Sequence, residues 1–216
     1  MSRALLLLNK LARMKRWESF WGNPIRAGQD PNPFYGHTPE WERQTKIRLM
    51  DGGMSNNLPN HVLARPERAA DIIISFDTSS DVQTGAATRR MYNFAKDCNI
   101  HLEDVTALSD PPRPRIATDG KELSTAAMEL EKKFLHMYAR VFHGGREDGR
   151  ELYIVYCPLL PNAVRPGFDP STTAFSTSYN LAWTPEQIEL LLATSEANVE
   201  HYATQMIKQV AHKATI

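Results

Sequence analysis

The sequence has little of what marks secreted proteins. Only two of its 216 residues are cysteines, Cys98 and Cys157, too few for a disulfide framework. No asparagine begins an Asn-x-Ser/Thr sequon, so nothing marks N-glycosylation. Both features favour a reducing, intracellular setting, and we therefore expect a cytoplasmic protein.

Excess charge and long apolar runs are also absent. The 25 Lys and Arg residues balance 25 Asp and Glu residues, giving a net charge of zero. A general nucleic-acid-binding protein needs a basic excess to displace counterions from phosphates, so we expect no nucleic-acid partner. No stretch approaches the roughly 20 apolar residues that a membrane span requires. The sequence therefore predicts no transmembrane segment.

The N-terminus is basic and partly apolar. Its first sixteen residues contain no acid and five bases: Arg3, Lys10, Arg13, Lys15 and Arg16. Leu7, Leu11 and Met14 fall near one helical face, which predicts an amphipathic helix. Such a helix packs against a core, the interpretation we favour, or lies on an anionic membrane surface. We assign residues 1–31 to this helix and a connector, and 32–216 to the main domain.

Strand-like and helix-like segments alternate along the rest of the chain. We expect strands at 46–50, 72–76 and 152–156, and helices at 86–98 and 125–142. The β-branched run Ile72–Phe76 predicts a strand buried on both faces. Gly144-Gly145 would stop the second helix, and the Pro/Gly/Asn-rich stretch 22–39 predicts a surface connector. The alternation predicts one α/β domain.

The last helix has the strongest signals. Thr184 can cap it, Pro185 suits its first position, and Gln187 completes the capping-box spacing. We expect it to run to about Ala211.

The strongest candidate for chemistry is the turn Asp51-Gly52-Gly53. It follows a predicted strand, and open α/β sheets place functional side chains at strand exits. A carboxylate there could accept a proton from a serine hydroxyl within hydrogen-bond reach. The alternative, which the local pattern alone favours, is a turn whose carboxylate bonds loop amides.

Other candidates are weaker. Ser55 follows the turn, but Asn57 stands where a Gly-x-Ser-x-Gly nucleophile motif needs glycine. His143-Gly144-Gly145 resembles a backbone-amide oxyanion loop, yet it follows a predicted helix, so we favour a helix stop. Asp77–Asp81 fits a site wall or, as we prefer, an ordinary polar turn. No metal-ligand spacing and no cofactor motif appears, so we expect no metal and no cofactor.

Two separated motifs resemble one enzyme family. "LMDGGMSNNLP" with "RPERAADIIISFDTSSD", and the closing segment "YCPLLPNAVRPGFDPSTTAFSTSYNLAWTPEQIELL", are similar to the cytosolic phospholipase A2 and fungal lysophospholipase family. The resemblance spans about residues 32–216. It implies a patatin-like α/β sandwich with a mixed, mostly parallel sheet, and it makes Asp51 the family's catalytic aspartate, with Gly52 and Gly53 shaping the turn.

The resemblance also implies a reaction. The family hydrolyses acyl esters of glycerophospholipids or lysophospholipids at membrane surfaces through a Ser-Asp dyad, without a metal. The family's serine elbow and glycine-rich oxyanion loop are not recognisable in these 216 residues. We therefore expect the C-terminal part of a catalytic domain, with an exposed sheet edge and little activity alone. The alternative is a non-catalytic remnant that binds lipid or protein.

Overall fold

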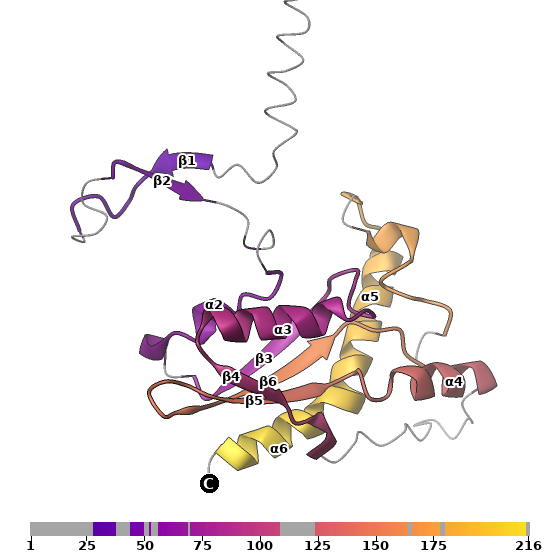
Figure 1. Cartoon of the computed structure of the whole chain (residues 1–216). Helices are drawn as coiled ribbons and strands as arrows, with labels where there is room; N and C mark the ends of the chain where they lie inside the picture. The colour runs from indigo at the N-terminus through magenta and orange to yellow at the C-terminus, as the bar shows by residue number, and fades with distance from the viewer. Residues whose placement is uncertain are drawn as a thin grey trace, which may run out of the picture. The chain divides into compact units, whose positions relative to one another are not determined.

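The computed structural model describes residues 28–37, 44–49, 52, 56–68, 70–108, 124–163, 166–177 and 180–214 (Figure 1). The chain divides into two compact units: unit 1 is Met1–Ser55 and unit 2 is Asn56–Ile216. The predicted N-terminal amphipathic helix lies outside the described residues.

In unit 1, the described elements form a two-stranded antiparallel ribbon. Strand β1 (Gly28–Pro31) pairs with β2 (Lys46–Leu49), so that Gly28 lies opposite Leu49. The buried Asn32 continues the ribbon, since its amide N–H donates to the Thr45 carbonyl at 3.0 Å. The strand expected at 46–50 is thus confirmed over 46–49, but the connector expected at 22–39 contains a strand. The partner strand β2 lies outside this stretch of the sequence, so the turn-forming composition of 22–39 could not reveal the strand pairing.

Unit 2 is built on a four-stranded mixed sheet. Its strands are β3 (Ile72–Asp77), β4 (His101–Asp104), β5 (Arg140–Gly145) and β6 (Glu151–Pro158), in the order β3-β6-β5-β4. Only the pair β3/β6 is parallel, while β5/β6 and β4/β5 are antiparallel. The α/β class is confirmed, but the expectation of a mostly parallel sheet is wrong for the described strands.

A tight turn explains the antiparallel pairing of β5 and β6. The Arg146 amide donates to the Arg150 carbonyl at 2.9 Å, and Gly149 has φ +80°. Such a left-handed conformation favours glycine, and Asp-Gly between two apolar runs is a strong hairpin signal. Asp148-Gly149 was therefore the sequence signal that could have predicted this hairpin.

Helices cover both faces of the sheet, giving three layers (Figure 1). On one face lie α2 (Asn60–Leu63) and α3 (Ala86–Asp97). The other face packs against the π-helical turn η5 (Val199–Ala203) and α6 (Thr204–Ala214). The remaining elements are α4 (Thr125–Phe134), α5 (Pro185–Asn198) and the short 3-10 turns η2 (Pro66–Arg68), η3 (Thr106–Leu108) and η4 (Ala174–Ser176).

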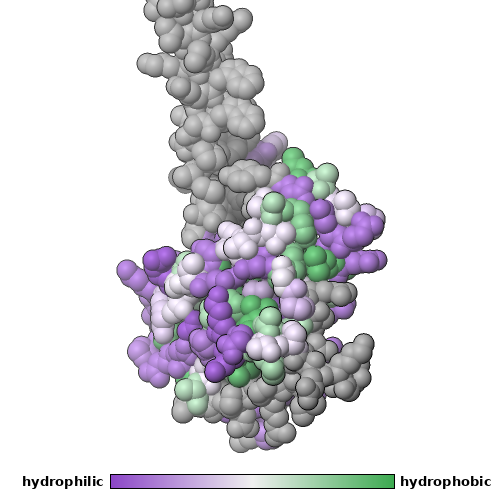
Figure 2. Space-filling view, turned by 90° about the vertical axis from the view of Figure 1, so that its right-hand side faces the viewer, coloured by the Kyte–Doolittle hydropathy of each residue, from purple (hydrophilic) through white to green (hydrophobic). Residues whose placement is uncertain are grey.

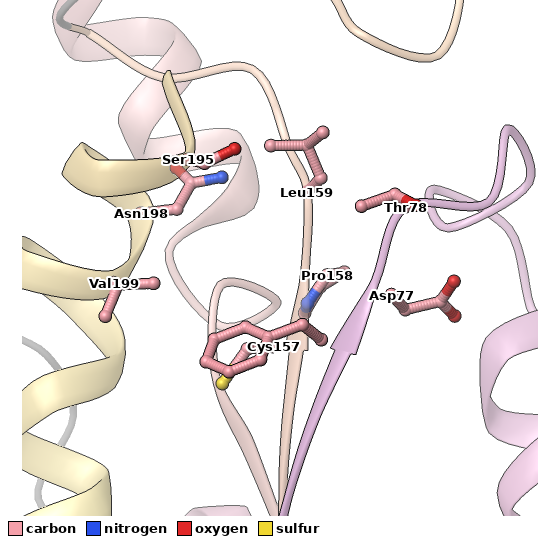
Figure 3. A pocket seen from close by; sticks show the side chains of 9 residues that line it. Asp77, Thr78, Cys157, Pro158, Leu159, Ser195, Asn198 and Val199 are labelled. Carbon is pink, nitrogen blue, oxygen red and sulfur yellow. The ribbon is translucent and has the colours of Figure 1, made fainter. Parts of the chain in front are cut away.

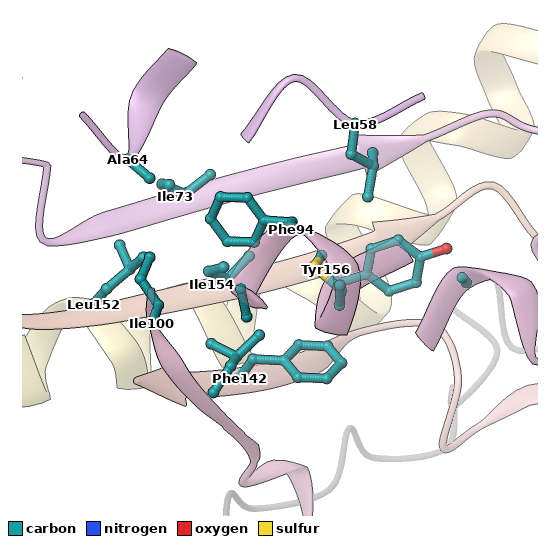
Figure 4. Close-up of a cluster of buried hydrophobic side chains, with 13 residues drawn as sticks. Leu58, Ala64, Ile73, Phe94, Ile100, Phe142, Leu152, Ile154 and Tyr156 are labelled. Carbon is teal, nitrogen blue, oxygen red and sulfur yellow. The ribbon is translucent and has the colours of Figure 1, made fainter. Parts of the chain in front are cut away.

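The larger core cluster lies between the sheet and α3. Phe94 of α3 meets Ile73, Phe142 and Ile154 from three different strands, all buried to within 2% (Figure 4). Fully burying one such side chain contributes about 2 kcal/mol to the free energy of unfolding. A second cluster on the opposite face joins Val155 of β6 to helical residues such as Met206.

Strand β3 lies at one end of the described sheet and is buried on one face only. Its Ile73, Ser75 and Asp77 are buried, whereas Ile74 is 39% and Phe76 57% exposed. The strand at 72–76 is confirmed, but its expected burial on both faces is wrong. The face with Ile73 packs against the first core cluster, whereas the described residues leave Ile74 and Phe76 on the other face partly uncovered.

The helix expected at 125–142 ends at Phe134, and residues 140–145 form β5. His143, Gly144 and Gly145 thus lie in a strand, and the helix-stop interpretation is wrong. Phe142 faces the first core cluster, so its apolar character serves β5 rather than a helix stripe. The helix at 86–98 and the strand at 152–156 are confirmed as α3 and β6.

The capping prediction for the last helix is confirmed. Thr184 Oγ1 accepts from the Gln187 amide at 3.3 Å, and Gln187 Oε1 accepts from the Thr184 amide at 3.0 Å. The helix continues beyond α5 through η5 into α6 and ends at Ala214.

Substitution of Gly144 tests how closely β5 approaches β4. A Cβ at Gly144 would lie 2.7 Å from the His101 carbonyl oxygen, whereas one at Gly145 meets nothing within 4 Å. We expect Gly144→Ala to lower the free energy of unfolding by about 1–3 kcal/mol because the backbone must shift. Gly145→Ala should change it by less than about 0.5 kcal/mol. Urea unfolding of both variants measures this, and equal effects would contradict the close approach.

Candidate functional site

Most of the predicted Asp-Gly-Gly turn lies outside the described residues. Asp51, Gly53 and the weaker candidate Ser55 are among the residues not described. Gly52 is described, and apart from Gly52 and its chain neighbours no described residue has an atom within 4 Å of the position that its Cβ would take. The roles predicted for these residues therefore stay predictions.

The asparagines that follow the turn in the sequence belong to unit 2 and bond to its other elements. Asn56 Nδ2 donates to the Arg90 carbonyl of α3 at 3.1 Å, and Asn56 Oδ1 accepts from the Leu58 amide at 3.0 Å. Asn57 Nδ2 donates to Ser79 Oγ at 2.9 Å. The Asn-Asn-Leu-Pro part of the first motif is thus held against the end of β3.

Beside it, an ion-pair network lies at the carboxyl end of β3. Asp77 Oδ2 accepts from Arg90 Nη2 at 2.7 Å and from the Tyr156 hydroxyl at 2.9 Å. Arg90 Nη1 also contacts both carboxylate oxygens of Asp81, at 2.9 and 2.8 Å. The network therefore joins β3, β6, α3 and the loop after β3. No spacing rule linked Arg90 and Tyr156 to Asp77, and sequence reasoning missed both.

Asp77 is ionised despite its burial. Burial alone would raise the pKa of its carboxyl, but hydrogen bonds from Ser79, Arg90 and Tyr156 outweigh it and hold the pKa below the ordinary value of 3.8. Arg90 has a raised pKa for matching reasons: burial lowers it, and Asp77 and Asp81 more than compensate. Burial and the negative charge of Asp77 raise the pKa of Tyr156. A carboxylate held in this way stabilises the fold and is a poor proton acceptor.

The turn interpretation for 77–81 is confirmed. Asp77 Oδ1 accepts from the Ser79 amide at 2.9 Å, which is an Asx turn. The same segment also forms a wall, because Asp77 and Thr78 line a cavity of about 160 Å³ between the ends of β3 and β6 and the helix α5 (Figure 3). The site-wall interpretation stays a prediction, because Asp51 lies outside the described residues.

The contacts of Cys157 and His143 indicate structural rather than catalytic roles. Cys157 is buried, and burial raises the pKa of its thiol to about 12, so it is inert as a nucleophile at neutral pH. The His143 ring stacks on Tyr153 with 4.5 Å between ring centroids, and Nε2 lies 3.5 Å from Glu151 Oε2. Within the described ranges, no three His, Cys, Asp or Glu side chains gather to hold a metal ion.

In the part of the chain that the structure describes, no helix is both long enough and apolar enough to cross a membrane.

Curated proteins with local similarity to this chain include two lysophospholipases and a putative phospholipase. A lysophospholipase of Penicillium chrysogenum is 41% identical over 59 residues, which are 26% of this chain and 10% of that protein. Lysophospholipase 3 of Aspergillus fumigatus is 40% identical over 55 residues, 24% of this chain and 9% of that protein. The putative meiotic phospholipase SPO1 of Saccharomyces cerevisiae is 33% identical over 85 residues, 36% of this chain and 13% of that protein.

The similar segments thus span about a tenth of the length of the curated relatives. No protein-family model matches the sequence. No solved structure matches it significantly. The local similarities support kinship with phospholipases and lysophospholipases, and so with lipid-hydrolysing enzymes.

The ion-pair network can be tested by two isosteric variants. Asp77→Asn leaves a largely buried Arg90 without its buried partner, and we expect it to lower the free energy of unfolding by about 3 kcal/mol. The side chain of Asp81 is 43% exposed, so Asp81→Asn should cost less than about 1 kcal/mol. Urea unfolding at neutral pH measures both. Equal losses of unfolding free energy in the two variants would show that Asp77 contributes no more to stability than Asp81 does.

The pH dependence follows from the lowered pKa of Asp77. Its stabilising contribution is complete above 3.8, the ordinary carboxyl pKa, and is lost as the pH falls through the lower pKa of the folded state. Asp104 has a lowered pKa as well, so the difference between the wild type and Asp77→Asn isolates the Asp77 contribution. We expect this difference to shrink in acid. A difference that is constant down to the lowest pH measured would contradict an ionised Asp77.

Proposed function

We propose that this chain supplies the aspartate of a phospholipase A2 or lysophospholipase that works through a Ser-Asp dyad. The observation that carries the proposal is the local identity of 33–41% to fungal lysophospholipases and a putative phospholipase. The motif around Asp51, with its Asn-Asn-Leu-Pro and Arg-Pro-Glu-Arg segments, supports it from the sequence. The substrate is a glycerophospholipid or lysophospholipid at a membrane surface, and the enzyme is cytoplasmic.

In this proposal Asp51 is the general base. It accepts the serine proton as the serine oxygen attacks the ester carbonyl carbon, and it passes this proton to the alkoxy group of the lipid, which leaves as the alcohol. Water then attacks the acyl-serine and gives a proton to Asp51, which returns it to the serine oxygen as the fatty acid is released. Gly52 and Gly53 shape the turn that presents the carboxylate. The serine and its oxyanion donors come from polypeptide outside these 216 residues, in a complete patatin-like domain.

A chimera tests the role of Asp51. Residues 46–81 of this chain replace the similar segment in the Penicillium chrysogenum lysophospholipase, and hydrolysis of lysophosphatidylcholine is measured. We expect the chimera to be active and Asp51→Asn in it to lower kcat on the order of 10³–10⁴-fold, as loss of a catalytic carboxylate does elsewhere. The matched control is Asp71→Asn, an exposed carboxylate of the same segment, which should change kcat less than twofold.

A chimera that unfolds cooperatively yet lacks activity, or one in which Asp51→Asn stays active, contradicts the proposal. The 216-residue chain is assayed beside it with the same lipid and a diacyl phospholipid. We expect no turnover above the blank. Turnover by the chain alone that disappears in Asp51→Ala would locate the nucleophile within the chain, with Ser55 the first residue to replace.

A further inference from the structure

A second cavity adjoins the one between β3, β6 and α5. It has a volume of about 220 Å³ and lies between the loop that follows β3 and the segment that leads into α5. It opens at the carboxyl ends of the parallel strands β3 and β6, where open α/β sheets bind ligands. Pockets for drug-sized molecules measure about 300–1,000 Å³, so this cavity suits a smaller ligand of about one six-membered ring.

Trp183 forms one wall of this cavity and is partly exposed. Its indole meets the ring of Phe175 at nearly a right angle, with 5.7 Å between the ring centroids. Phe175 in turn stacks on the buried Phe168, with 5.6 Å between the centroids. This row of three rings fixes the indole before a ligand arrives, and a fixed binding surface reduces the entropy that binding costs.

The backbone on both sides of Trp183 is also fixed. Asn180 Nδ2 donates to the Phe175 carbonyl at 2.7 Å, and Asn180 Oδ1 accepts from the Ala182 amide at 3.3 Å. The next residue along the chain, Thr184, forms the capping box of α5. The structure thus holds a flat aromatic surface in place at the wall of a small cavity. The negative face of such a ring attracts weakly positive C–H groups.

The polar side chains that line the cavity are hydroxyls. They belong to Thr78, Ser79, Ser171, Ser176 and Ser195. The oxygen of Ser171 is buried within the protein and cannot reach a ligand, whereas Thr78 is exposed. Because a hydroxyl is uncharged and both donates and accepts, this lining suits a neutral ligand with polar groups of the same kind.

Two of these hydroxyls have complementary capacities. Ser79 Oγ accepts from Asn57 Nδ2 at 2.9 Å, which leaves its own proton to donate. Ser176 Oγ donates to the Pro170 carbonyl at 2.7 Å, which leaves its lone pairs to accept. Ligand hydroxyls can bond to both, since each of them is a donor and an acceptor.

A sugar ring combines the two kinds of surface that this cavity presents. The C–H groups on one face of a pyranose ring are apolar and weakly positive, and they complement the negative face of an indole. The hydroxyls around the ring are uncharged donors and acceptors. The surroundings are mixed as well, because the side of unit 2 that carries α5 has hydrophobic residues, such as Leu181 and Ile188, among hydrophilic ones (Figure 2).

From these contacts we propose that the second cavity binds the pyranose ring of a neutral sugar. The apolar face of the ring lies on the indole of Trp183, and the ring hydroxyls bond to Thr78, Ser79 and Ser176. The proposal concerns binding only. It requires neither Asp51 nor a lipid, and it therefore goes beyond the hydrolysis proposed above.

The test titrates the 216-residue chain with the methyl glycosides of glucose, galactose and mannose. Binding is followed by calorimetry and by saturation-transfer difference NMR. We expect saturable binding of at least one glycoside, with a dissociation constant on the order of 1 mM for so small a ligand. The C–H protons on one face of its ring should receive the most saturation. Cyclohexanol, a ring of the same size with a single hydroxyl, should bind about tenfold more weakly.

Variants separate the aromatic wall from the hydroxyls. Trp183→Leu removes the aromatic face and should weaken binding about tenfold, whereas Trp183→Phe keeps a ring and should weaken it about threefold. The matched control is Tyr92→Leu on α3, an exposed aromatic residue that lines neither cavity and should leave the affinity unchanged. Thr78→Val removes one hydroxyl without a change of shape and should weaken binding about two- to tenfold.

Three outcomes would overturn the proposal: no saturable binding of any of the three glycosides, cyclohexanol binding as tightly as the best of them, or saturation spread evenly over the sugar protons. Unchanged affinity in a cooperatively folded Trp183→Leu variant would do the same. If Trp183→Leu does not fold, Trp183→Phe, Thr78→Val and the NMR pattern decide. Because no turnover is measured, this result is independent of the hydrolysis assay on Asp51.

Discussion

The bond between Asp77 and Arg90 is the interaction on which the described part of unit 2 depends. It closes the carboxyl end of β3, ties that strand to α3, and reaches β6 through the Tyr156 hydroxyl. A carboxylate that is 2% exposed needs such partners, because an unpaired buried charge would cost several kcal/mol. The loop after β3, the Asn56 contact with α3 and one wall of the cavity beside α5 adjoin this bond.

The parallel pairing of β3 with β6 has the second large effect. It brings two strand ends to one edge, where α5 and the π-helical turn η5 lie close by. At this edge Asp77, Ser195 and Asn198 form hydrogen bonds within the protein and present no free polar group to the cavity. An apolar cavity beside a buried ion pair is the result.

Several elements were predictable because their signals are local. The capping box of Thr184 and Gln187 depends on residues three positions apart, and the helical spacing of α3 and the β-branched run of β3 lie within single elements. The motif around Asp51 is equally local, which is why it could be recognised from the sequence. Its Asn-Asn-Leu-Pro part proved to be an anchor in unit 2.

Sequence patterns alone were enough for the α/β class, the last helix, the polar turn after β3 and the resemblance to lipid hydrolases. Packing was needed to find that β5 is a strand, that the sheet is mostly antiparallel over the described strands, and that Arg90 and Tyr156 meet Asp77. The physical reason is range. Caps, turns and side-chain periods act between near neighbours, whereas strand pairing and buried ion pairs join residues that only the packed chain brings together.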